Sequence, residues 1–568
     1  MKKMMSILLM LIMISALTTP ASAVSFSDIP SDGVLAGEVY KAVDYGLMNG
    51  YNATTFGYYN SMTRAQFTAV LVRMMGWELI APEAPTYIDV PKTHYWYSVL
   101  ETAAAHGVCD YDYQSDGRRF RPGDPITRAE MSELLVQALG LENAALSLNS
   151  NRMFPFSDLN HHTPFKDLPA GNEGYISVAY TIGMTKGTTA TTFSPNATAT
   201  RAQAAAMLVR MYEKMHRDTD FVHGFYAISS RSQLGLAENM NAVSAGWSRM
   251  IWDGETALLS TTSTNGNEFC IPTGYNEVTS ALENRNVPLN LSVYMDATNG
   301  LNDMLSSNAG QQATVSQIVN ELTVTYKTIG KNPYSGVTID FEGVTAANRG
   351  NFVHFLQELS AQISAIPGKT HTLYVCVQPV PTTSTVYQNG YDYKAIGTLA
   401  DKVILMAHDY DPRNLDSYVN GPGDTGSYHQ HCPTVPLDRI YLDLRNMTEL
   451  VDSSKVVLAF SARNIAWKID ANGKLLSGTP VSVAADTVAK RLAQSDTVTG
   501  WSPDYQQSWA IYTTEDGSHY FLWYQDEQSV QLELNTAKLL GVSGVSLWRL
   551  GTIPQHNTSS FNWSCLIE

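Results

Sequence analysis

The sequence has little charge, and basic residues are in the minority. Only 16% of the 568 residues are charged, and 37 lysines and arginines stand against 53 aspartates and glutamates, which gives a formal net charge of −16. This deficit of positive charge argues against a nucleic-acid partner, because phosphate backbones are bound by basic surfaces. Long apolar runs are also missing beyond the N-terminus, so we expect no membrane span in the mature chain.

Cysteine is scarce as well. The five cysteines are Cys109, Cys270, Cys376, Cys432 and Cys565. They are far apart, they form no C-x-x-C or cysteine–histidine metal pattern, and an odd number cannot pair completely within one chain. We therefore expect mostly free, packed thiols and no disulfide framework.

The first residues have the features of an export signal. Two lysines at positions 2 and 3 precede an apolar run over residues 4–17, and Ala21-Ser22-Ala23 offers a small-residue cleavage site. We predict a signal peptide over residues 1–23 and a secreted mature chain that starts near Val24. The length of the chain also exceeds that of a single core, which indicates two to four domains.

Three copies of one motif occupy the first third of the chain. They are Met62-Thr63-Arg64-Ala65-Gln66-Phe67, Ile126-Thr127-Arg128-Ala129-Glu130-Met131 and Ala199-Thr200-Arg201-Ala202-Gln203-Ala204. Their spacing of roughly 65 to 75 residues is that of a small repeated module. In each copy the threonine is a helix N-cap, and the glutamine or glutamate three residues later completes a capping box. We expect each module to consist of a helix, a turn and a second helix.

Capping does not explain the arginine of each copy. A cation in the first helical turn opposes the helix dipole by about 0.3–1 kcal/mol, yet Arg64, Arg128 and Arg201 all stand there. The bare N–H groups of a helix start, together with an arginine, can bind an anion. The alternative is a structural arginine that bridges to an acidic residue of a neighbouring module.

The three copies resemble S-layer homology domains, whose signature is T-R-A-E after a G-x-x-x-G-Y/F-x-P turn. The Thr, Arg and Ala of the signature occur in every copy, but its Glu occurs only as Glu130 and its central Gly-Tyr only as Gly50-Tyr51. The resemblance implies an all-α anchor of three modules, over residues 24–80, 81–145 and 146–217. It also implies that the three arginines bind an acidic secondary cell-wall polysaccharide, and hence that the protein is located at the cell wall and surface.

From residue 221 onward, β-rich runs alternate with helix-like spans. The eight candidate strands are Val222–Ser229, Ala242–Ser248, Val287–Met295, Gly336–Glu342, Thr372–Gln378, Lys402–Tyr410, Lys455–Ala462 and Gly544–Leu550. This alternation over roughly 340 residues favours an α/β fold, a (β/α)₈ barrel with insertions, over residues 221–568. Functional residues of such a barrel lie at the C-terminal ends of its strands.

The fourth of these runs, which continues to Gly343, carries the strongest chemical signal. Strand side chains alternate, so Thr338, Asp340 and Glu342 share one face. Like-charge repulsion and partial desolvation are expected to raise the pKa of one carboxyl, which can then act as a general acid on a glycosidic oxygen. The alternative is that the pair caps a neighbouring helix or forms a surface salt bridge.

Other polar and aromatic residues end the neighbouring strands. They are Gln378 on the fifth strand, His408, Asp409 and Tyr410 on the sixth, where Tyr410 is expected on the same strand face as His408, and Trp548 on the eighth. An indole at a barrel mouth offers a stacking surface to the apolar face of a sugar ring. The alternative for Trp548 is a core position.

The fourth run also resembles the signature of family 18 glycoside hydrolases, Asp-Gly-x-Asp-x-Asp-x-Glu. Near the C-terminus, Trp523-Tyr524-Gln525-Asp526 and Gly541–Gly551 resemble the W-Y-E-D and G-V-S-x-W-x-L-G segments of bacterial members, the spore-cortex type above all. The resemblance implies that Glu342 is the proton donor and that Asp340 orients the N-acetyl group of the substrate.

This chain departs from the family pattern at three positions. Ser335 and Thr338 replace two supporting aspartates of the signature, and His408 replaces the tyrosine of the M-x-Y-D motif, of which Asp409 matches the aspartate. The family tyrosine donates a hydrogen bond to the acetamido oxygen. Tyr410 or His408 itself would have to take over that role.

We therefore predict a secreted, wall-anchored glycosidase that cleaves β-1,4-linked N-acetylglucosamine polymers, either peptidoglycan or chitin. The family resemblance implies a substrate-assisted retaining mechanism, which needs neither a metal nor an organic cofactor. The predicted catalytic residues are Glu342 and Asp340, and the predicted substrate-binding residues are Asp409, Tyr410, His408, Trp548, Gln378 and Thr338. One alternative is a lectin-like envelope protein whose degenerate barrel binds sugar without cutting it. Another is a chitinase with a soluble or foreign substrate.

Overall fold

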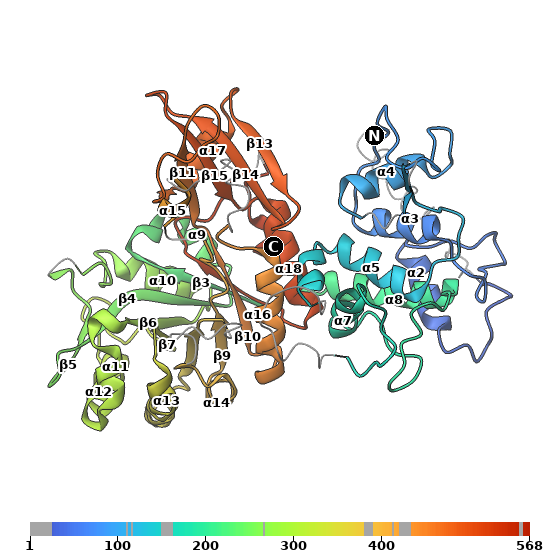
Figure 1. Cartoon of the computed structure of the whole chain (residues 1–568). Helices are drawn as coiled ribbons and strands as arrows, with labels where there is room; N and C mark the ends of the chain where they lie inside the picture. Colours follow the sequence, from blue (N-terminus) through green and yellow to red (C-terminus); the bar gives the residue numbers. More distant parts are fainter. Residues whose placement is uncertain are drawn as a thin grey trace, which may run out of the picture. The chain divides into compact units, whose positions relative to one another are not determined.

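The computed structural model describes residues 25–108, 112–114, 117–148, 163–264, 267–379, 390–411, 414–419, 433–555 and 560–567. The predicted signal peptide, Cys109 and Cys432 lie outside these residues. The chain divides into two compact units, one of residues 1–134 and 194–212 and one of residues 135–193 and 213–568, which we name the repeat unit and the barrel unit. Figure 1 labels most of the elements of both units. Cys270, Cys376 and Cys565 form no disulfide, as the sequence predicts.

The repeat unit consists of short helices joined by turns. Its elements are α2 (Ala36–Asp44), α3 (Arg64–Met74), α4 (Tyr97–Ala105), the hairpin strands β1 (Asp112–Gln114) and β2 (Gly117–Arg119), and the first parts of α5 (Arg128–Ala138) and α8 (Arg201–Met215). The three predicted capping boxes are present, because the side chains of Thr63, Thr127 and Thr200 accept from the third helical N–H and the Gln or Glu there accepts in return.

A ring of three backbone hydrogen bonds joins the three motif copies. The N–H of Met62 donates to the carbonyl of Ala199 at 3.1 Å, that of Ala199 to Ile126 at 3.0 Å, and that of Ile126 to Met62 at 2.9 Å. Each copy is therefore bonded to both others. The three copies close on one another instead of stacking in a line, and this arrangement places each motif arginine against the turn of another module.

Eight parallel strands close into the predicted barrel. In chain order they are β3 (Phe221–Tyr226), β4 (Ala242–Trp252), β6 (Leu289–Met295), β7 (Gly336–Phe341), β8 (Thr372–Val377), β9 (Lys402–Leu405), β10 (Val456–Ser461) and β16 (Gly544–Trp548). Each pairs with the next, and β16 pairs with β3 to complete the circle. The eight predicted strands are confirmed. The strand β5 (Ala257–Ser260) extends the sheet by antiparallel pairing with the long end of β4.

The predicted end of the sixth strand is wrong. The sixth strand ends at Leu405 instead of Tyr410, so His408, Asp409 and Tyr410 lie in the loop beyond β9. Asp409 there has a φ of 63°, a left-handed conformation that is incompatible with a continuous strand. The argument that Tyr410 shares a strand face with His408 therefore does not hold.

Helices cover the outside of the barrel. The helices of this unit are α6 (Glu142–Ser147), α7 (Glu173–Thr181), α9 (Leu234–Ala237), α10 (Tyr275–Asn284), α11 (Leu301–Ser306), α12 (Asn308–Thr323), α13 (Arg349–Ser364), α14 (Tyr393–Leu399), α15 (Asp416–Val419), α16 (Leu437–Leu450), α17 (Ala485–Leu492) and α18 (Glu527–Leu539). The outward face of β7 packs on α13, where the rings of Phe341 and Phe355 have centroids 5.3 Å apart. Among the described residues, none of the helices combines the length and the apolar character that a membrane crossing requires.

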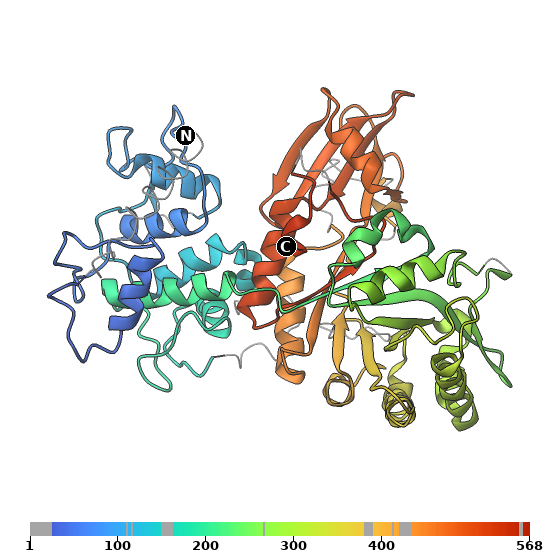
Figure 2. The ribbon, with the colours of Figure 1, turned by 180° about the vertical axis from the view of Figure 1, so that it is seen from behind.

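A five-stranded antiparallel sheet is inserted between β10 and α18. Its strands are β11 (Asn464–Ile469), β12 (Val481–Val483), β13 (Val498–Ser502), β14 (Gln507–Thr513) and β15 (His519–Tyr524), in the spatial order β12-β11-β15-β14-β13. The sheet begins just after the C-terminal end of β10, and Figure 2 shows it in orange extending from one end of the barrel. Trp467 and Trp523 are buried in a core of its own. The sequence predicts insertions in the barrel but not this sheet.

Candidate active site

A pocket of about 310 Å³ opens at the C-terminal ends of the barrel strands. It is lined by Phe225, Asp340, Glu342, Gln378, Pro379, Met406, His408, Asp409, Tyr410, Ala459 and Trp548. Seven of the eight side chains predicted from the sequence to act on or bind a substrate are among them. The barrel brings these seven together from four different strands, because the ends of parallel strands converge on one face.

Asp340 and Glu342 occupy the centre of this lining. Asp340 is the inward-facing residue near the end of β7 and is only 4% exposed, whereas Glu342 follows the strand and is half-buried. Burial, and then the charge of Glu342, raise the pKa of Asp340 well above its usual range. The prediction that one carboxyl of the pair has a raised pKa is confirmed for Asp340.

Two oxygen atoms in the pocket lining have no hydrogen-bond partner among the described residues. They are Oδ1 of Asp340 and Oε1 of Gln378, and both are buried. A buried acceptor without a partner costs about 1–3 kcal/mol, and a bound molecule that donates to it would recover this free energy. Their presence around one pocket indicates that the site is shaped to accept hydrogen bonds from a bound molecule.

Trp548 lies at the end of β16 and is partly exposed to the pocket. Its ring stands edge-on to Phe225 with centroids 5.0 Å apart. The indole is therefore held by the barrel interior on one side and faces the pocket on the other. This placement supports the predicted stacking surface over the alternative of a core position.

The loop beyond β9 carries a charged cluster that sequence reasoning found only in part. Asp409 lies 3.2 Å from Arg463 and 3.3 Å from Nδ1 of His408. Burial opposes ionisation, but the proximity of His408 and the charge of Arg463 outweigh it and lower the pKa of Asp409 to about 2. Arg463 also binds Asp411 at 2.5 Å. Arg463 follows the end of β10, so the rule that barrel sites use strand ends would have found it.

Tyr410 lines the pocket, but its hydroxyl has a partner on the protein. It donates to Asp443, a buried residue of α16. A hydrogen bond from Tyr410 to the substrate, as predicted, would have to replace this bond to Asp443.

Asp443 leads to a prediction on the pH dependence of stability. Burial raises its pKa to about 7, only partly offset by the Tyr410 bond and the charge of Arg439. In the unfolded chain this carboxyl has an ordinary pKa of about 3.9, so between about pH 4 and pH 7 it is ionised in the unfolded chain but still protonated in the folded protein. The free energy of unfolding therefore falls as the pH rises through this range. We expect Asp443→Asn to raise the free energy of unfolding on the order of 2–4 kcal/mol at pH 8 and hardly at all at pH 4.

Urea unfolding at pH 4 and pH 8 measures this difference. The exposed Asp303→Asn on α11 provides a matched control, because it makes the same chemical change without removing a buried charge. Equal effects of Asp443→Asn at the two pH values would contradict the assignment.

Thr338 is the one predicted substrate-binding residue outside the pocket lining. It is fully buried, and its hydroxyl lies 2.6 Å from Oγ of Ser244. Ser244 in turn bonds to His223, whose other ring nitrogen bonds to Ser546, both at 2.8 Å. Burial lowers the pKa of His223 to about 3, so this network beneath the pocket is uncharged near neutral pH. The structure places Thr338 in the barrel core instead of against a substrate.

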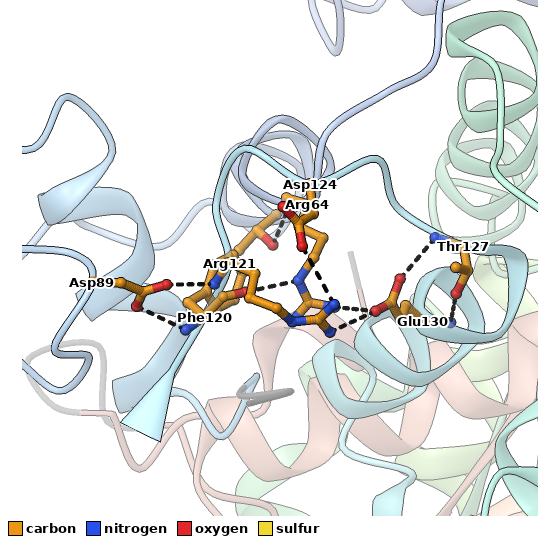
Figure 3. Close-up of polar contacts among 8 residues, drawn as sticks. Arg64, Asp89, Phe120, Arg121, Asp124, Thr127 and Glu130 are labelled. Carbon is orange, nitrogen blue, oxygen red and sulfur yellow. Dashed lines mark hydrogen bonds and ion pairs between the residues drawn. The ribbon is translucent and has the colours of Figure 1, made fainter. Parts of the chain in front are cut away.

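The motif arginines of the repeat unit differ in their partners. Arg64 is fully buried, donates from Nε to the carbonyl of Phe120 at 2.8 Å, and pairs with Glu130 at 2.7 Å. Figure 3 shows that Arg121 binds the same carboxylate, at 2.9 Å. This arrangement matches the structural alternative stated for the motif, an arginine bridging to the acid of a neighbouring module.

Arg201 has no such acidic partner. It donates to the carbonyls of Phe56 at 2.9 Å and Asn49 at 2.7 Å, and it lies under the half-exposed ring of Tyr51 at 4.4 Å. Within the described parts of the chain, no carboxylate lies within ion-pair distance of its guanidinium, since the capping-box residue here is Gln203. Arg128 uses its backbone N–H to bond Ala197 at 3.0 Å, as the other two copies do with their neighbours.

Sequence models of two families match the chain. The model described as glycosyl hydrolases family 18 matches residues 160–552, and that described as S-layer homology domain matches residues 25–68 and 86–132. The third copy, which the second model does not match, is supported by its capping box and by its place in the hydrogen-bonded ring.

Individual proteins show more distant similarity. A cortical fragment-lytic enzyme of Bacillus anthracis is 25% identical over 259 residues, which cover 44% of this chain and 52% of that protein. The enzyme of the same name from Bacillus subtilis (strain 168) is 24% identical over 291 residues, 49% of this chain and 60% of that protein. The chain thus spans about half the length of the curated relatives it matches.

A solved chitinase from Chromobacterium violaceum ATCC 12472 is 22% identical, with a TM-score of 0.45, over 58% of this chain and 94% of that chain. The family model covers more than two thirds of the sequence, and its match includes the whole pocket lining. The chain therefore belongs to glycosyl hydrolases family 18 and carries S-layer homology domains at its N-terminal end.

Proposed function

We propose that this protein is a wall-anchored glycosidase that hydrolyses a β-1,4-linked N-acetylglucosamine polymer. The observation that carries the proposal is the pair Asp340 and Glu342, which lie together in a pocket beside a partly exposed tryptophan. The raised pKa of Asp340 means that the pair holds a proton at a pH where two isolated carboxyls would not. A shared proton in a partly dry pocket is what acid catalysis on a glycosidic oxygen requires.

The family's substrate-assisted retaining mechanism fits these residues. Glu342 protonates the leaving oxygen while the acetamido oxygen of the substrate attacks the anomeric carbon and forms an oxazolinium ion. Asp340 orients and stabilises the acetamido group. Glu342, then a carboxylate, activates the water that opens the oxazolinium ion and restores the original configuration. Trp548 supports the sugar ring, and the acceptor of Gln378 is available to its hydroxyl groups.

Peptidoglycan is the substrate that we favour. The curated relatives quoted above are named cortical fragment-lytic enzymes, and S-layer homology domains imply attachment at the cell surface, where peptidoglycan is at hand. A protein held at the wall meets this polymer at high local concentration, so even modest affinity suffices.

Incubation of the full chain with peptidoglycan and with chitin oligomers, followed by mass analysis of the products, tests the proposal. We expect release of fragments with an N-acetylglucosamine reducing end from peptidoglycan. Release from chitin alone would support the chitinase alternative. Sugar binding without any product from either polymer would support the lectin-like alternative and overturn the proposed activity.

We propose further that secondary cell-wall polysaccharide is the partner of the repeat unit and that Arg201 is its principal anion-binding residue. The guanidinium of Arg201 is bonded to carbonyl groups and lies against the rings of Tyr51 and Phe56, with no ion pair among the described residues, so a carboxylate of the polysaccharide would neutralise it. Arg64 already has Glu130 in that position.

A further inference from the structure

The thiol of Cys376 lies beside the carboxyl of Asp340 inside the barrel. The strands β7 and β8 are parallel neighbours in which Ile339 pairs with Val375, so Asp340 and Cys376 are the next positions along both strands. Cys376 packs among the inward-facing residues of the barrel, and Asp340 lines the pocket directly above them. The two side chains therefore occupy one layer of the barrel interior.

Both groups are withdrawn from water. Cys376 has no exposed surface, and its place beside Asp340 on the neighbouring strand puts the thiol next to a carboxyl that is only 4% exposed. Burial and the nearby charges of Asp340 and Glu342 raise the pKa of the thiol well above its usual range, so Cys376 keeps its proton. A protonated thiol is a weak hydrogen-bond donor, and a carboxylate is the acceptor that benefits most from it.

Thr338, the nearest hydroxyl on the same strand face, has a different partner. It lies two residues before Asp340, but its hydroxyl is bonded to Ser244 at 2.6 Å in the uncharged network that continues through His223 to Ser546. Oδ1 of Asp340 accepts no hydrogen bond within the described residues. The thiol is therefore the neighbour placed to donate to one side of the carboxyl, which leaves the other side available to the pocket.

We infer that Cys376 is a positioning residue, whose S–H group holds one oxygen of Asp340 so that the other faces the N-acetyl group of the substrate. This inference rests on the proposed hydrolase function. In this chain a neutral thiol from the neighbouring strand supports Asp340, and no charged side chain lies at position 338 to do so.

The first test compares the kinetics of Cys376→Ala, Cys376→Ser and the parent. Without the donor, Asp340 takes up a proton at higher pH, so we expect the acidic limb of the pH–rate profile to move to higher pH and kcat to fall about tenfold, with little change in KM. The serine variant keeps a donor at the same place and restores most of kcat and of the profile. Cys270→Ser makes the same change at a buried thiol outside the pocket lining and leaves the profile unchanged.

An unchanged profile in Cys376→Ala, or a defect that Cys376→Ser shares in full, would overturn the inference. A second measurement does not depend on activity. The infrared S–H stretching band of Cys376, assigned from the difference between the parent and Cys376→Ser, is expected to shift to higher frequency in Asp340→Ala because the hydrogen bond is lost. A band at the same frequency in the parent and in Asp340→Ala rejects the contact. A parent that cleaves neither polymer but shows the shift rejects only the proposed function.

Discussion

Glu342→Gln is expected to reduce kcat on peptidoglycan by about 10²–10⁴-fold or more, because it removes the group that serves as acid in the first step and as base in the second. The amide has nearly the shape of the carboxyl, so the fold and the pocket are retained. The substitution also removes the charge repulsion between Glu342 and Asp340, which is one cause of the raised pKa of Asp340. The variant should therefore still bind an N-acetylglucosamine oligomer with about the parent affinity.

Steady-state hydrolysis and calorimetric binding of the oligomer, measured on the same preparation, separate the two effects. Glu255→Gln, an exposed position in the turn between β4 and β5, makes the same chemical change away from the pocket and should leave both unchanged. Hydrolysis at the parent rate by Glu342→Gln would exclude Glu342 as the catalytic acid. Loss of both hydrolysis and binding would point to misfolding of the site.

Arg64→Met is expected to destabilise the repeat unit by about 3 kcal/mol, because it breaks a buried ion pair and leaves the carbonyl of Phe120 without its donor. Arg121 continues to bind Glu130 and limits the loss. Hydrogen exchange followed by mass spectrometry localises the effect, since faster exchange should be confined to peptides of the repeat unit. Hydrolysis by the barrel should be unaffected.

The variant Arg64→Met/Glu130→Met provides a double-mutant cycle. The double variant removes both charges, so it should recover part of the lost protection from hydrogen exchange. Additive losses would mean that the two side chains do not interact.

Arg201→Gln is expected to have the opposite effect to Arg64→Met, a loss of polysaccharide binding without a loss of stability. Arg201→Gln should reduce co-sedimentation of the protein with purified secondary cell-wall polysaccharide at least tenfold. Arg64→Met should retain this binding at temperatures where the repeat unit is folded. Equal loss of binding in the two variants would remove the distinction between the two arginines.

Several features of the fold were predictable from local patterns. The eight barrel strands follow from β-rich runs between helical spans, and the period-two alternation in Gly336–Phe341 correctly separates the core face from the face of Asp340. The capping boxes are equally local, because they involve residues three positions apart. The strand ends that line the pocket then follow from the general geometry of parallel barrels.

Other features depend on contacts between residues far apart in the chain. The end of β9 at Leu405 and the left-handed Asp409 were missed, because no glycine or proline separates the strand-forming residues Val403-Ile404-Leu405 from Tyr410. The sheet β11–β15 was missed because its central pairing joins β11 to β15, which lie far apart in the chain. Trp523, which resembles a family motif residue, is buried in that sheet.

Composition and short-range spacing are sufficient to identify a repeated, capped helical module and a strand with two carboxyls on one face. They do not distinguish Arg64 from Arg201, which stand in nearly the same local motif but meet Glu130 in one case and backbone carbonyls in the other. Nor do they bring Cys376 to Asp340, or Asp443 to Tyr410. Charge state and hydrogen bonding are properties of the neighbours that a side chain acquires on folding, and those neighbours come from other strands and other modules.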